Sequence, residues 1–249
     1  MNPSLLPFRS SVKKLVELPA TGLLYKVDFD RKKVDQIRKD LQEYKAKLVA
    51  VSKTKSVTSI QALYDYGQKA FGENYVQELV DKKSQLPDDV EWHFIGHLQS
   101  NKVKLISPFV SLIHGVDSIK LLQEIDKQSA KSGKVQSCLL QIFIASEETK
   151  FGLSMDEADE LLNHPVLSSL NHVSISGFMG MATFTEDTTK IRSEFRSLKT
   201  FFDAQKKKSF CQNVQLQELS MGMTSDYLIA LEEGSTMVRI GSAIFGERN

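Results

Sequence analysis

The strongest constraint on the fold is a regular alternation of short apolar runs with longer stretches of helical periodicity. Eight apolar runs follow one another from residue 47 onward, and runs of this length are typical of strands. The predicted strands are 47–53, 69–73, 91–95, 110–116, 136–144, 172–179, 215–221 and 236–241. Helical patterns precede the first strand at 31–44 and fill the gaps at 57–66, 74–84, 98–106, 118–131, 155–163, 188–206 and 225–233.

Eight strands separated by seven helices predict an α/β fold, a single (β/α)8 TIM barrel, which typically needs roughly 250 residues. The chain has 249 residues, of which 41% are hydrophobic, so a core of that size is available. A doubly wound open sheet is the alternative arrangement. Because Pro, Gly and Ser do not cluster into a linker, we expect one domain over residues 1–249.

The composition argues against several classes of function. The chain has 32 basic and 31 acidic side chains and a formal net charge of +1. Such a balance does not produce the positive electrostatic potential that attracts nucleic acid or an anionic membrane. No apolar run approaches the roughly 20 residues that a membrane span needs. Cys138 and Cys211 lie far apart and in no CxxC pattern, so we expect two reduced, mostly buried thiols rather than a disulfide framework or a zinc cluster.

These features predict a soluble, cytoplasmic protein. The first 16 residues carry Arg9, Lys13 and Lys14 and no acidic residue, which is weakly typical of an organelle transit peptide and leaves an association with mitochondria open. We interpret this stretch as an ordinary N-terminal helix.

Polar residues stand at the carboxyl ends of the predicted strands, which is where the chemistry of a TIM barrel lies. The first strand ends on an amine, the second on a carboxylate and an amide, the third carries an imidazole, and the last carries a guanidinium. These residues are Lys53, Glu73, Asn74, His93 and Arg239. We expect amine, amide, imidazole and guanidinium to converge on one mouth of the barrel.

Two loops near the end of the sequence have the composition of a phosphate site. The stretch "GSTMVRIGSAIFGER" (234–248) passes from a β-branched strand to Gly241 and Ser242 and then to a short helical pattern. Glycine permits close approach, the hydroxyl can donate, and backbone N–H groups open toward an anion in such a turn. The stretch "LSMGMTSD" (219–226) repeats this design one strand earlier. Phosphate sites after strands seven and eight recur in TIM barrels, so the two loops predict a phosphorylated ligand.

Lys53 shares one face of its strand with Val49 and Val51, because side chains alternate along a strand. Three roles are open for an amine at this place: a solvated strand end, a point charge for a phosphate, or a nucleophile that forms a Schiff base. Lys55 is a second amine of the same parity beyond the strand end, and a neighbouring cation lowers the pKa of a lysine.

Seven stretches, in one order, resemble the YggS/PROSC family of pyridoxal 5′-phosphate (PLP) homeostasis proteins. They are "LVAVSKTK", "FGENYVQE", "WHFIGHLQSNK", "ETKFGL", "GFMGM", "LSMGM" and "GSTMVRIGSAIFG". The resemblance implies a barrel like the N-terminal domain of alanine racemase, without a second β domain, and PLP as the cofactor, held as an internal aldimine. Residues 1–30 match the family poorly and are expected to form an N-terminal extension.

The resemblance also implies the roles of individual residues. Lys53 of "AVSK" forms the aldimine, and Arg239 of "VRIG" faces the pyridine nitrogen. Asn74 and His93 line the cofactor pocket. The phosphate is held by two groups of residues, Ser220 with Met221 and Gly222, and Gly241 with Ser242.

An arginine opposite the ring nitrogen disfavours catalysis. PLP stabilises carbanions best when an acidic partner protonates its ring nitrogen, whereas a guanidinium donates a hydrogen bond and keeps its proton. Racemisation also needs a second base, which alanine racemase takes from another domain, and we expect no room for that domain after Gly241. We therefore expect a monomeric, non-enzymatic PLP-binding protein in vitamin B6 homeostasis that buffers the cofactor or delivers it to PLP-dependent apo-enzymes.

Two alternatives remain at this stage. One is an amino-acid racemase of low activity, with Lys53 as one base and His93 or Tyr75 as the other; the second is a barrel for an unrelated phosphorylated metabolite. A metal site is disfavoured. His93 and His97 are four residues apart, but we place them in a strand and beyond Gly96, without the carboxylate of an HExxH motif.

Overall fold

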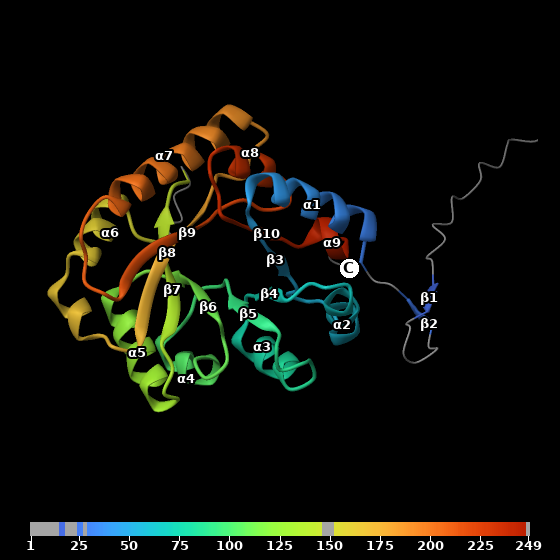
Figure 1. The fold of residues 1–249 in the computed structure, drawn as a ribbon, viewed down its shortest axis with the longest axis horizontal. Helices are drawn as coiled ribbons and strands as arrows, with labels where there is room; N and C mark the ends of the chain where they lie inside the picture. Colours follow the sequence, from blue (N-terminus) through green and yellow to red (C-terminus); the bar gives the residue numbers. More distant parts are fainter. Residues whose placement is uncertain (1–14, 18–23, 27–28, 146–151, 248–249) are drawn as a thin grey trace, which may run out of the picture.

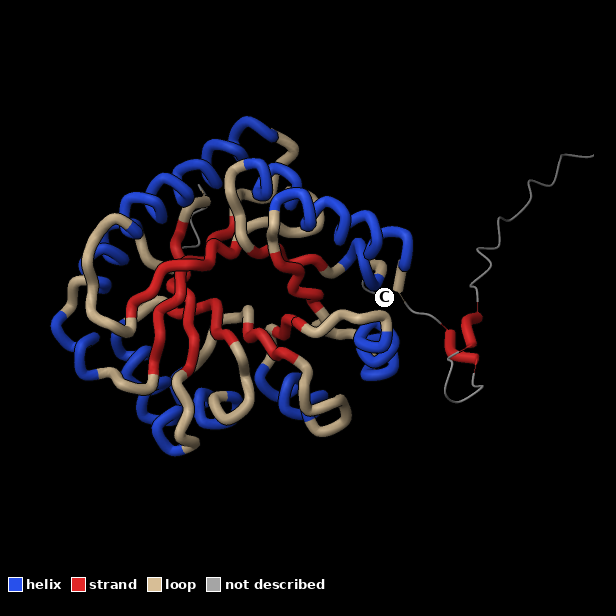
Figure 2. The backbone as a smooth tube through the Cα atoms, viewed as in Figure 1, coloured by secondary structure: helices blue, strands red, loops and turns tan. Residues whose placement is uncertain are grey.

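The computed structural model describes residues 15–17, 24–26, 29–145 and 152–247. Eight parallel strands form a closed barrel in the order β10-β3-β4-β5-β6-β7-β8-β9, and helices surround it (Figures 1 and 2). The barrel strands are β3 (Lys47–Val51), β4 (Ala70–Glu73), β5 (Glu91–Phe94), β6 (Leu112–Val116), β7 (Gln136–Phe143), β8 (Val173–Met181), β9 (Val214–Ser220) and β10 (Met237–Ile240).

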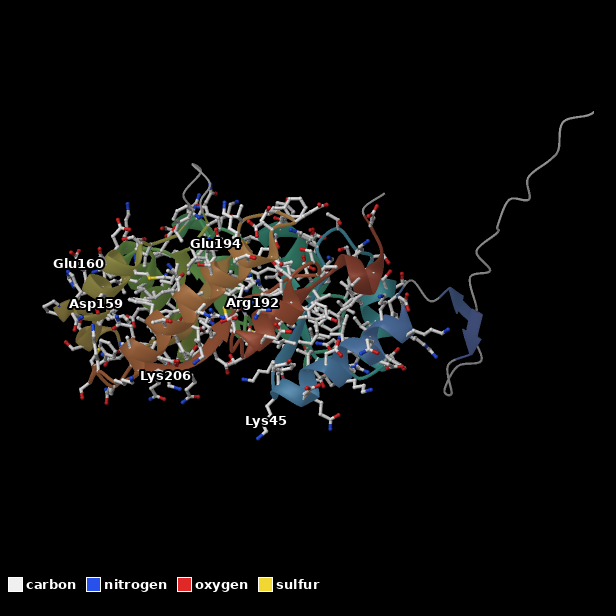
Figure 3. All side chains as sticks on the ribbon, turned by 90° about the horizontal axis from the view of Figure 1, so that it is seen from above. Lys45, Asp159, Glu160, Arg192, Glu194 and Lys206 are labelled. Atoms are coloured by element: carbon white, nitrogen blue, oxygen red, sulfur yellow. The ribbon has the colours of Figure 1, made fainter. Side chains whose placement is uncertain are left out.

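The helices of the outer layer follow the strands in turn. They are α1 (Arg31–Tyr44), α2 (Val57–Asp65), α3 (Val76–Lys83), α4 (Val103–Ile106), α5 (Ile119–Lys131), α6 (Met155–Leu162), α7 (Thr188–Lys206), α8 (Tyr227–Glu232) and α9 (Ser242–Phe245), with 3-10 turns η1 (Ser100–Lys102) and η2 (Pro165–Ser169). Charged side chains of α7 differ in their surroundings: Arg192 pairs with Glu232 and Glu233 at the end of α8, whereas Lys206 is exposed (Figure 3). Two further strands, β1 (Leu15–Glu17) and β2 (Leu24–Lys26), pair as an antiparallel ribbon.

Serine caps fix the starts of several helices. Ser56, Ser118 and Ser154 each accept a hydrogen bond from the backbone N–H three residues later, which satisfies a donor that the helix itself leaves unpaired. At α6 the cap is reciprocal, because the Glu157 carboxylate accepts from the Ser154 N–H at 2.7 Å. These caps fix the residue at which each of these helices begins, and so they fix the length of the loop that precedes it.

The barrel separates two apolar regions. The larger core lies between the strands and the helices, and a small cluster fills the inside of the barrel. The inner cluster is Val49, Leu112, Leu139, Met179 and Met237. On β3, the inward position of Val49 places Ala50 and Ser52 on the outer face, toward the helices. This division decides which residue at the end of β3 can reach the mouth.

The backbone hydrogen bonds at the seam between β9 and β10 continue into the residues that flank the two strands. Met237 pairs with Ser220, and the N–H groups of Thr236, Met221 and Arg239 donate to the carbonyls of Leu219, Met237 and Gly222 at 3.0, 3.1 and 2.9 Å, respectively. Side chains add to the seam: the Ser235 hydroxyl donates to the Leu219 and Met221 carbonyls at 3.1 and 2.8 Å. The guanidinium of Arg239 also crosses this seam, as described below.

The structure confirms the predicted barrel, and the closed strand order shows that the open-sheet alternative is wrong. The predicted strand and helix bounds agree with the observed ones within two residues, although the stretch 98–106 divides into η1 and α4. The expected helix over the first 16 residues lies outside the described residues up to residue 14, and Leu15–Glu17 is a strand. The single domain over 1–249 stays a prediction. None of the helices in the described ranges has the length and apolar character of a membrane span.

Gly177 offers a test of the packing between β8 and β9. Its φ is +156°, and a Cβ there would lie 1.7 Å from the Glu218 carbonyl oxygen, at a register shift between the two strands. We expect Gly177→Ala to lower the free energy of unfolding by about 3 kcal/mol, because backbone rather than a movable side chain meets the new atom. Denaturant unfolding measures the loss.

Gly133→Ala is the matched control. Its φ is +61° and a Cβ there meets nothing within 4 Å, so only the left-handed backbone opposes the substitution, at about 1 kcal/mol. Equal losses in the two variants would contradict the packing argument.

Candidate functional site

A cavity of about 470 Å³ opens at the carboxyl ends of the barrel strands. It is lined by residues of β3, β8 and β10 and of the loops that follow β3, β4, β5, β8, β9 and β10, which are distant in sequence. The polar residues among them are Lys53, Thr54, Lys55, Asn74, Thr224, Ser225, Arg239 and Ser242. Parallel strands bring their carboxyl ends to one edge, so this is the mouth at which TIM barrels carry their sites.

Lys53 and Lys55 have different places in this mouth. Lys53 follows β3 on the inward face, next to Val51, and lines the cavity. Lys55 also borders the cavity, but its ammonium donates to the carbonyl oxygens of Phe245, Gly246 and Glu247 at 3.3, 3.1 and 3.2 Å. A cation suits the carbonyls at the end of a helix. Lys55 therefore holds the segment that follows α9.

Arg239 is a buried guanidinium that borders the cavity from β10. Its Nη1 donates to the Ser220 carbonyl at 2.8 Å and to the Ser220 hydroxyl at 2.6 Å, and its Nη2 donates to the Gly180 carbonyl at 3.0 Å. Burial lowers the pKa of Arg239 to about 10, opposed by the charge of Asp226. The group is therefore still a cation at neutral pH and can only donate hydrogen bonds.

A chain of hydrogen bonds runs from Arg239 through the inside of the barrel. Ser220 Oγ lies 3.1 Å from His114 Nδ1, and His114 Nε2 lies 3.0 Å from His93 Nδ1. Burial lowers the pKa of His93 to about 4, with a smaller contribution from Lys47. Burial also lowers the pKa of His114 well below its ordinary value, with smaller contributions from His93 and Arg239. Both imidazoles are therefore neutral near pH 7.

The structure corrects the expected place of His93. Its side chain lines a second cavity, of about 590 Å³, at the amino ends of the strands together with Lys47 and Glu218. Ile95, two residues later on the same face, is the residue that reaches the upper cavity. His93 thus faces into the barrel as predicted, but it lies one layer below the mouth.

The first of the two predicted phosphate loops reaches the cavity through later residues than expected. Ser220 is occupied by Arg239 and His114, and Met221 is fully buried. Gly222 turns the chain with a φ of +97°, where a Cβ would lie 2.6 Å from the Ala230 side chain. Beyond this turn, Met223, Thr224 and Ser225 line the cavity.

The second of the two predicted phosphate loops borders the cavity directly. Gly241 and Ser242 line the cavity, and the Ser242 hydroxyl donates to Thr224 Oγ1 at 3.2 Å. A Cβ on Gly241 would lie 3.1 Å from the Val51 carbonyl, so the glycine permits close approach of the two strand ends. The two loops therefore meet, and their hydroxyls face one space.

Asn74 supplies an unsatisfied polar atom at the cavity. Its Oδ1 is buried and has no hydrogen-bond partner among the described residues. Buried acceptors of this kind usually have a partner, so one from outside the protein is indicated. The site therefore combines an amine, a guanidinium, several hydroxyls and a buried amide oxygen around one cavity. This donor set fits a ligand that carries an aldehyde, a phosphate and an aromatic nitrogen.

The described residues give no support for a metal. Within the ranges described above, no group of three or more His, Cys, Asp or Glu side chains lies close enough to hold one. His97 Nδ1 lies 3.8 Å from an Asp117 carboxylate oxygen, whereas His93 pairs with His114. Cys138 is buried and Cys211 half-buried, and both are free thiols.

Comparison with known proteins defines the class of this barrel. The family model "Alanine racemase, N-terminal domain" matches residues 30–249. Alanine racemase of Clostridium difficile 630 has the same fold, with a TM-score of 0.69 at 14% identity over 88% of this chain and 56% of that one. The chain is a barrel of the alanine racemase N-terminal class.

Closer relatives identify the particular family. The pyridoxal phosphate homeostasis protein of Aquifex aeolicus is 41% identical over 204 residues, which are 82% of this chain and 87% of the relative. The human protein of that name is 38% identical over 225 residues, 85% of this chain and 80% of the relative. The chain belongs to the family of pyridoxal phosphate homeostasis proteins, which confirms the resemblance seen in the sequence.

A solved structure from this family has been described in two states. PipY of Synechococcus elongatus PCC7942 without PLP has a TM-score of 0.78 at 34% identity, over 86% of this chain and 99% of that one. The same protein with PLP bound has a TM-score of 0.76 at 33% identity and the same coverage.

The buried imidazole of His93 predicts a pH dependence of stability. Its pKa is about 4 in the folded protein and 6.5 in an ordinary setting, so between these values the unfolded chain binds more protons than the folded one. The free energy of unfolding should then fall as the pH decreases from 6.5 toward 4. In His93→Gln this fall should be shallower, as measured by urea unfolding at a series of pH values.

His97→Gln is the control, because its side chain is 56% exposed. This variant should keep the slope of the wild-type protein. A His93→Gln variant with the wild-type slope would contradict the predicted titration of His93.

Proposed function

We propose that this protein binds PLP at the mouth of the barrel and serves in PLP homeostasis by holding the cofactor. The observation that carries the proposal is the convergence of Lys53, Arg239 and the two hydroxyl-bearing loops on one cavity. The family assignment and the PLP-bound relative support it. The aldehyde, the phosphate and the ring nitrogen of PLP would each have a suitable partner in this cavity.

Lys53 is the proposed point of covalent attachment. Its neutral amine would replace the oxygen of the aldehyde, which leaves as water, and a Schiff base remains. Thr224, Ser225 and Ser242 would donate to the phosphate through their hydroxyls, and Gly241 permits the close approach. Asn74 Oδ1 would accept from a donor of the ligand.

Arg239 is proposed to donate to the ring nitrogen. Because the guanidinium keeps its proton, the nitrogen would remain an unprotonated acceptor. Bound PLP supplies an electron sink for amino-acid chemistry, and that sink is weaker without a proton on the ring. The hydrogen bonds from Arg239 to Ser220 and Gly180 fix its guanidinium, so Arg239 is aimed before any ligand arrives.

The arrangement of the side chains supports a role in buffering or delivering PLP better than it supports racemisation. A racemase needs a second base facing the lysine, and neither residue considered for it suits the task. His93 is bonded to His114 one layer below the cavity, and Tyr75 is 58% exposed outside the cavity lining. We propose a cytoplasmic monomer whose recipients are PLP-dependent apo-enzymes.

Borohydride reduction followed by peptide mass spectrometry tests the attachment. The wild-type protein incubated with PLP should carry the pyridoxyl group on Lys53. Lys53→Ala should lose both this adduct and the absorbance band of the imine. Lys55→Met should keep the adduct on Lys53, because the Lys55 ammonium binds the chain after α9.

Three results would count against parts of this proposal. An adduct chiefly on Lys55 would contradict the assignment of Lys53. A wild-type protein that forms no reducible adduct would favour an unrelated phosphorylated metabolite. Exchange of the Cα proton of an amino acid at an ordinary enzymatic rate would favour the racemase.

A further inference from the structure

A buried ion pair lies directly behind the turn that carries Lys53. Lys82 on α3 donates to Glu73 Oε1 at 2.7 Å and to Glu78 Oε1 at 2.7 Å. The Lys82 side chain is 6% exposed and that of Glu73 0%. The pair is on the outer face of β4, in the layer where neighbours such as Phe71 and Leu79 form the apolar core.

The stability of the fold does not account for this pair. Removing two charges from water costs as much as their attraction returns, and an apolar pair of similar volume is often equally stable or more so. The hydrogen bonding is also incomplete, because Glu73 Oε2 is buried without a partner among the described residues. Burial raises the pKa of Glu73 in spite of the opposing charge of Lys82.

The ion pair instead makes specific contacts with both neighbours of Lys53. Lys82 Nζ donates to the Ser52 carbonyl at 2.8 Å, and the Ser52 hydroxyl donates to Glu73 Oε1 at 2.6 Å. On the other side of Lys53, the Thr54 N–H donates to Glu78 Oε1 at 2.5 Å. The peptide groups before and after the lysine are thus held by one set of charges.

Thr54 has a backbone conformation that needs such support. Its φ is +64°, in the left-handed region that a β-branched residue rarely adopts and that costs on the order of 1 to 2 kcal/mol. The hydrogen bond to Glu78 offsets this strain. After this left-handed turn, the chain reaches Lys55, whose ammonium binds the carbonyls at the end of α9 and beyond.

We infer that Glu73, Glu78 and Lys82 form a positioning network that fixes the backbone on both sides of Lys53 and so aims its amine into the cavity. The inference rests on the proposed attachment of PLP to Lys53. None of the three residues lines the cavity. They act through the residues on either side of Lys53: they bind the hydroxyl and the carbonyl of Ser52 and the backbone N–H of Thr54.

The double variant Glu73→Leu with Lys82→Met separates positioning from stability. It replaces the ion pair by apolar side chains and removes both contacts to Ser52. We expect a folded protein with a free energy of unfolding close to that of the wild-type protein, because the cost of burying two charges disappears while the buried Ser52 hydroxyl loses its Glu73 acceptor. The apparent Kd for PLP should rise about tenfold, because the amine is no longer held in the productive geometry. After reduction, the share of the pyridoxyl group on Lys53 should fall and that on other lysines should rise.

Glu78 allows a second test that does not disturb the buried pair. Glu78→Gln keeps a side-chain oxygen for the Thr54 N–H and should retain most of the affinity for PLP, whereas Glu78→Ala removes it and should weaken binding severalfold. Lys83→Met is the matched control on the same helix, because Lys83 pairs only with the exposed Asp88 among the interactions described. It should bind PLP like the wild-type protein.

The outcomes distinguish this inference from the proposed function. A wild-type protein without an adduct on Lys53 would refute the attachment itself. If the wild-type adduct forms, a folded double variant with unchanged Kd and unchanged adduct position would overturn the network. Should the double variant fail to fold, the Glu78 pair decides, and equal Kd values for Glu78→Ala and Glu78→Gln would likewise overturn the inference.

Discussion

Arg239 holds a buried charge where β8, β9 and β10 meet at the mouth of the barrel. Backbone hydrogen bonds join β10 to the end of β9, and the guanidinium adds to them by donating to Ser220 on β9 and to Gly180 on β8. The same guanidinium borders the cavity. One group thus contributes both to the contacts among these strands and to the polar lining of the mouth. A ligand that contacts Arg239 touches an element that also joins three strands.

Much of the fold could be predicted from the sequence because it depends on local periodicity. The apolar runs marked all eight barrel strands, and the parity of Val49, Val51 and Lys53 gave the lysine its inward face. Parity gives the face of a strand but not the height within the barrel. That height depends on the stagger of the strands, so the sequence predicts that His93 faces inward but not the layer of the barrel in which it lies.

Other parts of the site depend on geometry that the sequence does not display. The left-handed turn at Gly222 moves Thr224 and Ser225 to the cavity in place of Ser220. The glycine predicts a turn, but the sequence does not show that the turn passes too close to Ala230 for a side chain at this position. The network of Glu73 and Lys82 joins a strand to a helix through two charges whose contact the sequence does not predict. Only the structure shows that both are buried.

The chain of hydrogen bonds that begins at Arg239 has a defined donor and a defined acceptor at each step. Since Arg239 only donates, the Ser220 oxygen accepts from it, and the hydroxyl proton is available to His114. His114 can then donate to His93 Nδ1, which leaves the His93 proton on Nε2, at the floor of the barrel. These hydrogen bonds connect the cavity at the carboxyl ends of the strands with the cavity at their amino ends. The NMR resonances of the His93 imidazole, at the amino ends of the strands, should consequently respond when a ligand contacts Arg239 at the mouth.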